Sequence, residues 1–291
     1  MNARPMPVWE LEAQLGEGPV WVERDRALWF VDINEQRIHR FDPASNDRRS
    51  WDSPEKVGFI FPAEGGGFVA GLQSGLHRFD ETSGGFELIV AVEPDLPTNR
   101  LNDGIVDPAG RLWFGTMDSG EKAKTGAFFC FGEGRLTRTQ LDGIAITNGP
   151  AVSPDGKLLY FVDTLKGTIG VADIGDDGLL GNPRPFVRID PREGHPDGPT
   201  IDSNGDLWIA LYGGWEVRRY SPSGQQLEVV RFPVANITKI ALGKDDLRTA
   251  YATTARQKLS PDVIAQQPLI GSLFEFPVEV AGVPCPLVRL R

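Results

Sequence analysis

The chain has 291 residues, of which 40% are hydrophobic, and a net charge of −10. This apolar content is sufficient for a packed core, and the acidity argues against a nucleic-acid partner, which would favour a basic face. Two cysteines are too few for a disulfide framework, no apolar run is long enough to span a membrane, and the first residues do not resemble a signal peptide. We therefore expect a cytoplasmic protein without a membrane partner.

Short segments rich in β-branched and aromatic residues recur along the chain, each preceded by a turn and followed by a second strand-like segment. In chain order they are residues 28–32, 67–71, 112–116, 158–163, 207–210 and 250–253. One marker residue in each segment fixes the spacing: Leu28, Phe68, Leu112, Leu158, Leu207 and Tyr251. Successive markers are 40, 44, 46, 49 and 44 positions apart, a period typical of propeller blades. We predict an all-β, six-bladed β-propeller that comprises residues 1–291 as a single domain. Residues 8–11 and 287–290 are the candidate strands for closing the ring.

Four repeats carry a carboxylate or carboxamide side chain ten or eleven residues before the marker. These residues are Glu17, Asn102, Asn148 and Asp197, each followed within two positions by glycine. A single Asn-Gly or Asp-Gly pair is an ordinary turn dipeptide, but four in register predict polar side chains that converge at one end of a channel. Glu17, Asn148 and Asp197 form an all-oxygen set, which suits a hard or borderline divalent cation.

Motifs at these positions resemble those of the regucalcin (SMP-30)/gluconolactonase/LRE family. They span residues 16–21, 99–104, 107–111, 115–117, 146–149, 161–163, 196–198 and 253–256, and residues 265–269 and 277–282 are similar to bacterial sugar lactonases of the xylonolactonase type. The resemblance implies a monomeric six-bladed propeller with one divalent metal ion in its channel. It also implies that Glu17, Asn148 and Asp197 are the metal ligands and that Arg100 and Asn102 bind the substrate.

The chain departs from the family pattern just after residues 115–117, where some members carry acidic residues that contact the substrate. Here the sequence is Asp118-Ser119-Gly120-Glu121, so Asp118 and Glu121 are both candidates for that contact. The sequence also leaves the identity of the metal open, because oxygen ligands accept Ca²⁺, Zn²⁺, Fe²⁺, Mn²⁺ or Mg²⁺.

The functional hypothesis is metal-dependent hydrolysis of a sugar-acid lactone, an aldonolactone such as the pentonolactone xylonolactone. Asp197 is the candidate base for the attacking water because it can both touch the metal and lie near that water. Two alternatives are a gluconolactonase or other ester hydrolase, and a non-catalytic, regucalcin-like calcium-binding propeller. A serine-hydrolase mechanism is poorly supported, because the sequence has no Gly-x-Ser-x-Gly motif.

Overall fold

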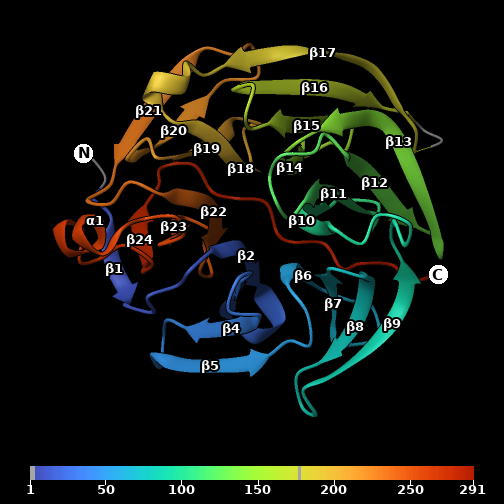
Figure 1. Ribbon diagram of the computed structural model, residues 1–291, viewed down its shortest axis with the longest axis horizontal. Helices are drawn as coiled ribbons and strands as arrows, with labels where there is room; N and C mark the ends of the chain where they lie inside the picture. Colours follow the sequence, from blue (N-terminus) through green and yellow to red (C-terminus); the bar gives the residue numbers. More distant parts are fainter. Residues whose placement is uncertain (1–3, 176–177) are drawn as a thin grey trace.

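The computed structural model describes residues 4–175 and 178–291, which form six four-stranded antiparallel sheets arranged in a ring (Figure 1). This arrangement confirms the predicted all-β, six-bladed propeller. All six marker residues of the repeat lie in the second strand of their blade, counted outward from the channel. The residues upstream of each marker therefore form the innermost strands, which face the channel.

Within five of the blades, the strands follow one another in sequence from the channel outward. The innermost strands are β2 (Gly16–Val22), β6 (Val57–Pro62), β10 (Asn99–Val106), β14 (Thr147–Val152), β18 (His195–Ile201) and β22 (Ile237–Gly243). The second strands are β3 (Ala27–Asp32), β7 (Phe68–Leu72), β11 (Leu112–Asp118), β15 (Leu158–Asp163), β19 (Leu207–Tyr212) and β23 (Thr249–Thr254). The third strands are β4 (Arg37–Asp42), β8 (Gly75–Asp80), β12 (Gly126–Gly132), β16 (Thr168–Ile174), β20 (Glu216–Tyr220) and β24 (Leu273–Pro277). The outermost strands are β5 (Asp47–Asp52), β9 (Gly85–Ala91), β13 (Arg135–Ile144), β17 (Leu180–Arg188), β21 (Gln226–Arg231) and β1 (Met6–Trp9).

Helical structure is confined to α1 (Pro261–Gln266) and two 3-10 turns, Glu23–Asp25 and Pro191–Glu193, within the described residues. None of these helices has the length and apolar character needed to cross a membrane.

The blades are held together by apolar side chains that pack between neighbouring sheets. Trp29 of the first blade lies 4.3 Å from Phe68 of the second, measured between ring centroids. Trp21 stacks on Tyr251 of the last blade at 6.0 Å, which joins the two ends of the ring. Such aromatic pairs stabilise beyond their area of contact, so the ring is one continuous packed structure.

The N-terminal strand closes the ring, as expected, but the C-terminal strand does not. β1 pairs antiparallel with β24 and is the outermost strand of the last blade. Residues 287–290 instead make a single parallel bridge, between Val288 and Ala63 of the second blade. Because β1 already occupies the free edge of β24, the expectation that 287–290 also completes that sheet is wrong.

The C-terminal tail crosses one end of the channel, visible as the red trace through the centre of Figure 1. Residues 283–286 of the tail, with the last residues of the innermost strands, line an apolar cavity of about 100 Å³. The first residues of the same strands open at the opposite end. That end carries the residues singled out by the sequence.

Candidate metal and substrate site

An irregularity near the start of every innermost strand directs the polar side chains. All six innermost strands show a register shift with the second strand at this place. A bulge inserts an unpaired residue and breaks the alternation of faces, so it changes the direction of the side chains beside it. Glu17, Asn102, Asn148 and Asp197 all lie at or next to these bulges, and each is at least 94% buried.

The corresponding positions of the other two blades explain why only four repeats contribute. Gly58 occupies this place in β6, where a Cβ atom would lie 2.4 Å from the carbonyl oxygen of Asn102. Thr238 occupies it in β22, and its Oγ1 donates to the carbonyl oxygen of Gly16 at 2.6 Å. These two blades support the backbone that carries the other four side chains.

Six of the seven residues predicted for the site line one cavity of about 270 Å³. They are Glu17, Arg100, Asn102, Glu121, Asn148 and Asp197. Asp118 is not one of the lining residues; its Oδ2 accepts hydrogen bonds from the backbone N–H groups of Lys122 and Ala123, both at 3.1 Å. The Asp118 carboxylate thus orders the loop that carries Glu121, and its contact with substrate stays a prediction.

A chain of hydrogen bonds fixes the orientation of the two amide side chains. Nη1 of Arg100 donates to Oδ1 of Asn102 at 2.6 Å, and Nδ2 of Asn102 donates to Oδ1 of Asn148 at 2.9 Å. Nδ2 of Asn148 donates in turn to Oγ1 of Thr164 at 2.8 Å. Asn148 therefore presents its oxygen, the atom a metal ion requires, on the side of Asn102.

Glu17 and Asp197 are buried carboxylates that form no ion pair within the described chain, although the charges of Lys239 and Arg100 act on both of them. One oxygen of Glu17 accepts from the backbone of Gly18 at 2.8 Å, and no hydrogen bond or ion pair within residues 4–175 and 178–291 reaches the carboxylate of Asp197. Burial, reinforced by the charge of Asp103, raises the pKa of Glu17 to about 8. Burial and the charge of Glu17 raise the pKa of Asp197 in the same way.

This donor set fits a divalent cation. Two buried carboxylates repel each other, and a bound cation compensates their charge. The side-chain atoms that Glu17, Asn148 and Asp197 offer as ligands are all oxygens, which suit such an ion. The described residues contain no group of three or more His, Cys, Asp or Glu side chains placed to hold a metal. The candidate set stays the one predicted from the sequence, Glu17, Asn148 and Asp197, and three ligands leave coordination positions for water and substrate.

Two further polar side chains that line the cavity, Gln257 and Lys258, were not singled out by the sequence. Gln257 and Lys258, on the segment after β23, contact Glu121: Nε2 of Gln257 lies 3.3 Å from Oε1, and Nζ of Lys258 pairs with Oε2. The Tyr212 hydroxyl donates to the backbone oxygen of Gln257 at 3.0 Å. These contacts connect loops of the third, fifth and sixth blades over the cavity.

Comparisons with known proteins identify the family. A sequence profile described as the SMP-30/Gluconolactonase/LRE-like region matches residues 15–256. The chain is 39% identical over 272 residues to L-arabinolactonase of Azospirillum brasilense, covering 92% of this chain and 90% of that protein. It is 34% identical over 275 residues to 6-deoxy-6-sulfogluconolactonase of Pseudomonas putida, covering 94% of both.

The fold is similar to that of a solved relative over its full length. The crystal structure of a calcium-binding protein, regucalcin, from Agrobacterium tumefaciens superimposes with a TM-score of 0.94 at 29% identity, covering 100% of this chain and 98% of that one. The matches confirm the resemblance drawn from the motifs, and the two lactonases support the predicted enzyme class, a carboxylic-ester hydrolase. The chain belongs to the SMP-30/gluconolactonase/LRE-like family.

Proposed function

We propose that the protein hydrolyses a sugar-acid lactone to the open-chain acid with the help of one divalent metal ion. The observation that carries this proposal is the pair of buried carboxylates, Glu17 and Asp197, that face one cavity and form no ion pair within the described chain. Glu17, Asn148 and Asp197 would hold the ion, which when bound would polarise the lactone carbonyl as a Lewis acid.

The protein's own residues bind and orient the sugar ring. Arg100 lines the cavity and stays protonated at neutral pH, because burial lowers its pKa only to about 10. One of its nitrogens bonds Asn102, and its remaining guanidinium N–H groups are donors for ring hydroxyls. Glu121 on the loop after β11 supplies an acceptor for a sugar hydroxyl from the other side. A cavity of about 270 Å³ accommodates a five- or six-carbon lactone.

Asp197 takes the proton from the attacking water. Burial and the charge of Glu17 raise its pKa, and a raised pKa makes its carboxylate a stronger base than that of an ordinary aspartate. The relatives named arabinolactonase and sulfogluconolactonase favour an aldonolactone as substrate. Among aldonolactones, we propose a pentonolactone such as xylonolactone or arabinonolactone.

The test is a panel of xylono-, arabinono-, galactono- and gluconolactone, with proton release followed over time in metal-stripped and metal-restored protein. We expect turnover only with metal, and a loss of at least a hundredfold in kcat for Asp197→Asn. Turnover without metal, or full activity of Asp197→Asn, contradicts the mechanism. Stoichiometric binding of Ca²⁺ with no turnover of any lactone would favour the calcium-binding alternative.

A further inference from the structure

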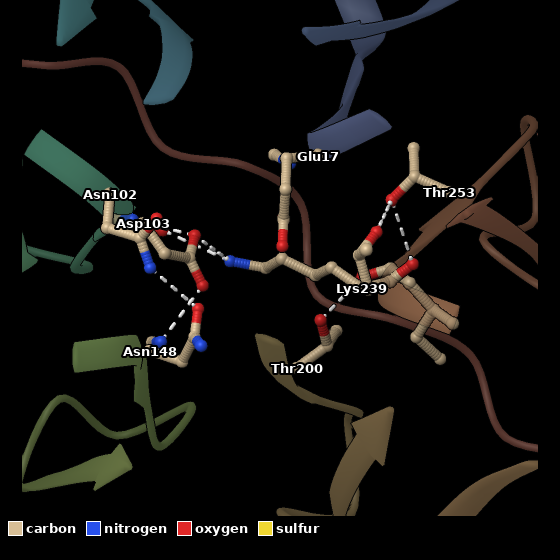
Figure 2. Close-up of polar contacts among 12 residues, drawn as sticks. Glu17, Asn102, Asp103, Asn148, Thr200, Lys239 and Thr253 are labelled. Atoms are coloured by element: carbon tan, nitrogen blue, oxygen red, sulfur yellow. Dashed lines mark hydrogen bonds and ion pairs between the residues drawn. The ribbon is translucent and has the colours of Figure 1, made fainter. Parts of the chain in front are cut away.

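The channel has a second layer of charge directly behind the candidate metal ligands. Asp103 follows Asn102 on β10, and Lys239 follows Thr238 on β22, so both lie one residue deeper than the ring of site residues. Their side chains are 1% and 4–5% exposed, and Nζ of Lys239 lies 2.6 Å from Oδ1 of Asp103. Figure 2 shows Lys239 reaching across the channel to Asp103, which lies beside Asn148.

Asp103 and Lys239 bond or pack against residues adjacent to two of the ligands. Oδ2 of Asp103 accepts from the backbone N–H of Gly149, next to Asn148, at 3.0 Å. A Cβ at Gly198, next to Asp197, would lie 2.6 Å from Cβ of Lys239, so the lysine stem runs directly against that glycine. The pair therefore holds the backbone on which these ligands stand.

The pair also sets the charge that a metal ion would meet. Asp103 is a third carboxylate close to Glu17 and Asp197, and its charge acts on both of them. Lys239 is the ammonium ion bonded to it, and Nζ also donates to the carbonyl oxygen of Gly104 at 3.3 Å. With Asp103 neutralised by Lys239, the negative charge at the ligands is that of Glu17 and Asp197, and Arg100 is a further cation whose charge acts on both.

We propose that Lys239 is a positioning residue of the metal site, which neutralises Asp103 and holds it away from the ion, so that Asp103 does not add its negative charge to that of the ligands. This inference rests on the proposed function, because it presupposes that the site binds a metal ion. Lys239 and Asp103 are not ligands in this arrangement. They act on the ligands through their electrostatic field and through the backbone that carries Asn148 and Asp197.

The test is a set of three variants, Lys239→Met, Asp103→Asn and the double variant, each titrated with Ca²⁺ and with Zn²⁺ by calorimetry after removal of metal. Methionine keeps most of the length of the lysine stem and removes its charge. Lys239→Met exposes the ligands to an uncompensated carboxylate, so we expect metal binding about tenfold tighter. Asp103→Asn leaves an uncompensated ammonium ion, so we expect binding about tenfold weaker, with the double variant within about threefold of the native protein.

A purely structural role for the pair gives a different pattern. In that case both single variants lower the melting temperature and neither tightens metal binding, which would overturn the inference. If Lys239→Met does not fold, the double variant is compared with Asp103→Asn instead. The double variant must then bind metal more tightly than Asp103→Asn, because it lacks the uncompensated ammonium ion. Lactone turnover gives a second readout: we expect Lys239→Met to lower kcat with KM unchanged, because the extra negative charge opposes the developing oxyanion.

The native protein, titrated in parallel, separates the two proposals. A native protein that binds no metal contradicts the proposed function. A native protein that binds metal and turns over a lactone, while all three variants bind with unchanged affinity, contradicts only the role given to Lys239.

Discussion

His39 is a buried histidine whose surroundings favour the neutral ring. The rings of Trp9 and Phe30 lie 5.5 and 5.0 Å from it, and Oγ of Ser50 lies 2.7 Å from its Nδ1. Burial, assisted by the charge of Arg37, lowers the pKa of His39 to about 4. The unfolded chain binds a proton at His39 below about pH 6.5 while the folded chain does not. Stability is therefore complete above pH 6.5 and is lost as the pH falls toward 4.

We predict that His39 removes about 3 kcal/mol from the free energy of unfolding between pH 6.5 and pH 4, at about 1.4 kcal/mol for each unit of pKa. Urea unfolding at a series of pH values measures this loss. His39→Gln should flatten the dependence in this range, whereas His77→Gln, which replaces a partly exposed histidine, should leave it unchanged. Equal slopes for native protein and His39→Gln would contradict the assignment.

Glu121 and Asp118 were equivalent candidates in the sequence, and the structure gives them different surroundings. Glu121 lines the cavity, and Asp118 bonds the backbone of its own loop. We predict that Glu121→Gln raises KM for the lactone about tenfold, because a carboxylate acceptor is replaced by a weaker amide. Asp118→Asn retains an acceptor oxygen for the loop and should change KM less than threefold. Steady-state kinetics of the two matched variants decide between them, and the reverse order would assign the contact to Asp118.

The alignment of repeats could predict Glu17, Asn102, Asn148 and Asp197 because their distance from the marker is nearly constant. It could not predict Lys239. The marker Tyr251 is the third residue of β23, whereas Leu112, Leu158 and Leu207 begin their strands, so Thr238 lies 13 residues before Tyr251 and Lys239 lies 12 before it. A residue pair such as Asp103 and Lys239, separated by 136 positions, becomes recognisable only when the ring brings β10 and β22 together.

At the scale of the element, a buried aspartate joins the turn before the second strand to the tryptophan in that strand. In the third blade Asp107 is fully buried and accepts from the backbone N–H groups of Ala109 and Arg111 at 2.9 and 3.0 Å. Its Oδ2 also accepts from Nε of Arg111 at 2.6 Å and from the indole of Trp113 at 2.9 Å. Asp202 repeats the contact to an indole in the fifth blade, with Trp208 at 3.0 Å.

We predict that Asp107→Ala lowers the free energy of unfolding by about 3 kcal/mol, because it leaves a buried indole N–H and a guanidinium group without acceptors. Ser153→Ala is the matched control in the fourth blade. The Ser153 hydroxyl accepts from the backbone of Leu158 at 2.9 Å, and no tryptophan occupies the corresponding strand position. Its loss should cost about 1 kcal/mol. Urea denaturation of both variants measures the difference, and equal losses would show that the indole contact contributes nothing.

The elements were predictable from the sequence because each strand is short, alternating and bounded by a turn dipeptide. The Asp-Pro-Ala-Gly turn at 107–110 and the strand beginning at Leu112 are both where the repeat places them. The bulges that carry the polar side chains were harder to predict from the sequence. A bulge is a property of two paired strands, and the sequence of β14 alone does not reveal that Asn148 faces Val162 of β15 while Ala151 faces Tyr160.

At the scale of the whole molecule, the two ends of the chain have separate tasks that local sequence does not distinguish. Residues 6–9 and 287–290 both have a strand-like composition, yet only the former completes a sheet. The tail lies across the end of the channel remote from the candidate site, where Gly282 and Val288 are held by backbone hydrogen bonds to Leu247 and Pro62. One terminus therefore closes the ring and the other covers the channel.

Trp9 is an aromatic residue of the closing strand that packs against the first blade. β1 pairs with β24 of the last blade, and the Trp9 ring lies 5.6 Å from Phe30 and 5.5 Å from His39, edge to face in both cases. Trp9→Ala removes these contacts at the seam, so we predict a loss of about 3 kcal/mol of unfolding free energy. Trp215→Ala, at a tryptophan that is 43% exposed, should cost less than about 0.5 kcal/mol. Because the seam joins the first and last blades, Trp9→Ala should also lower the metal affinity contributed by Glu17, whereas an independent outer strand would leave calorimetric metal binding unchanged.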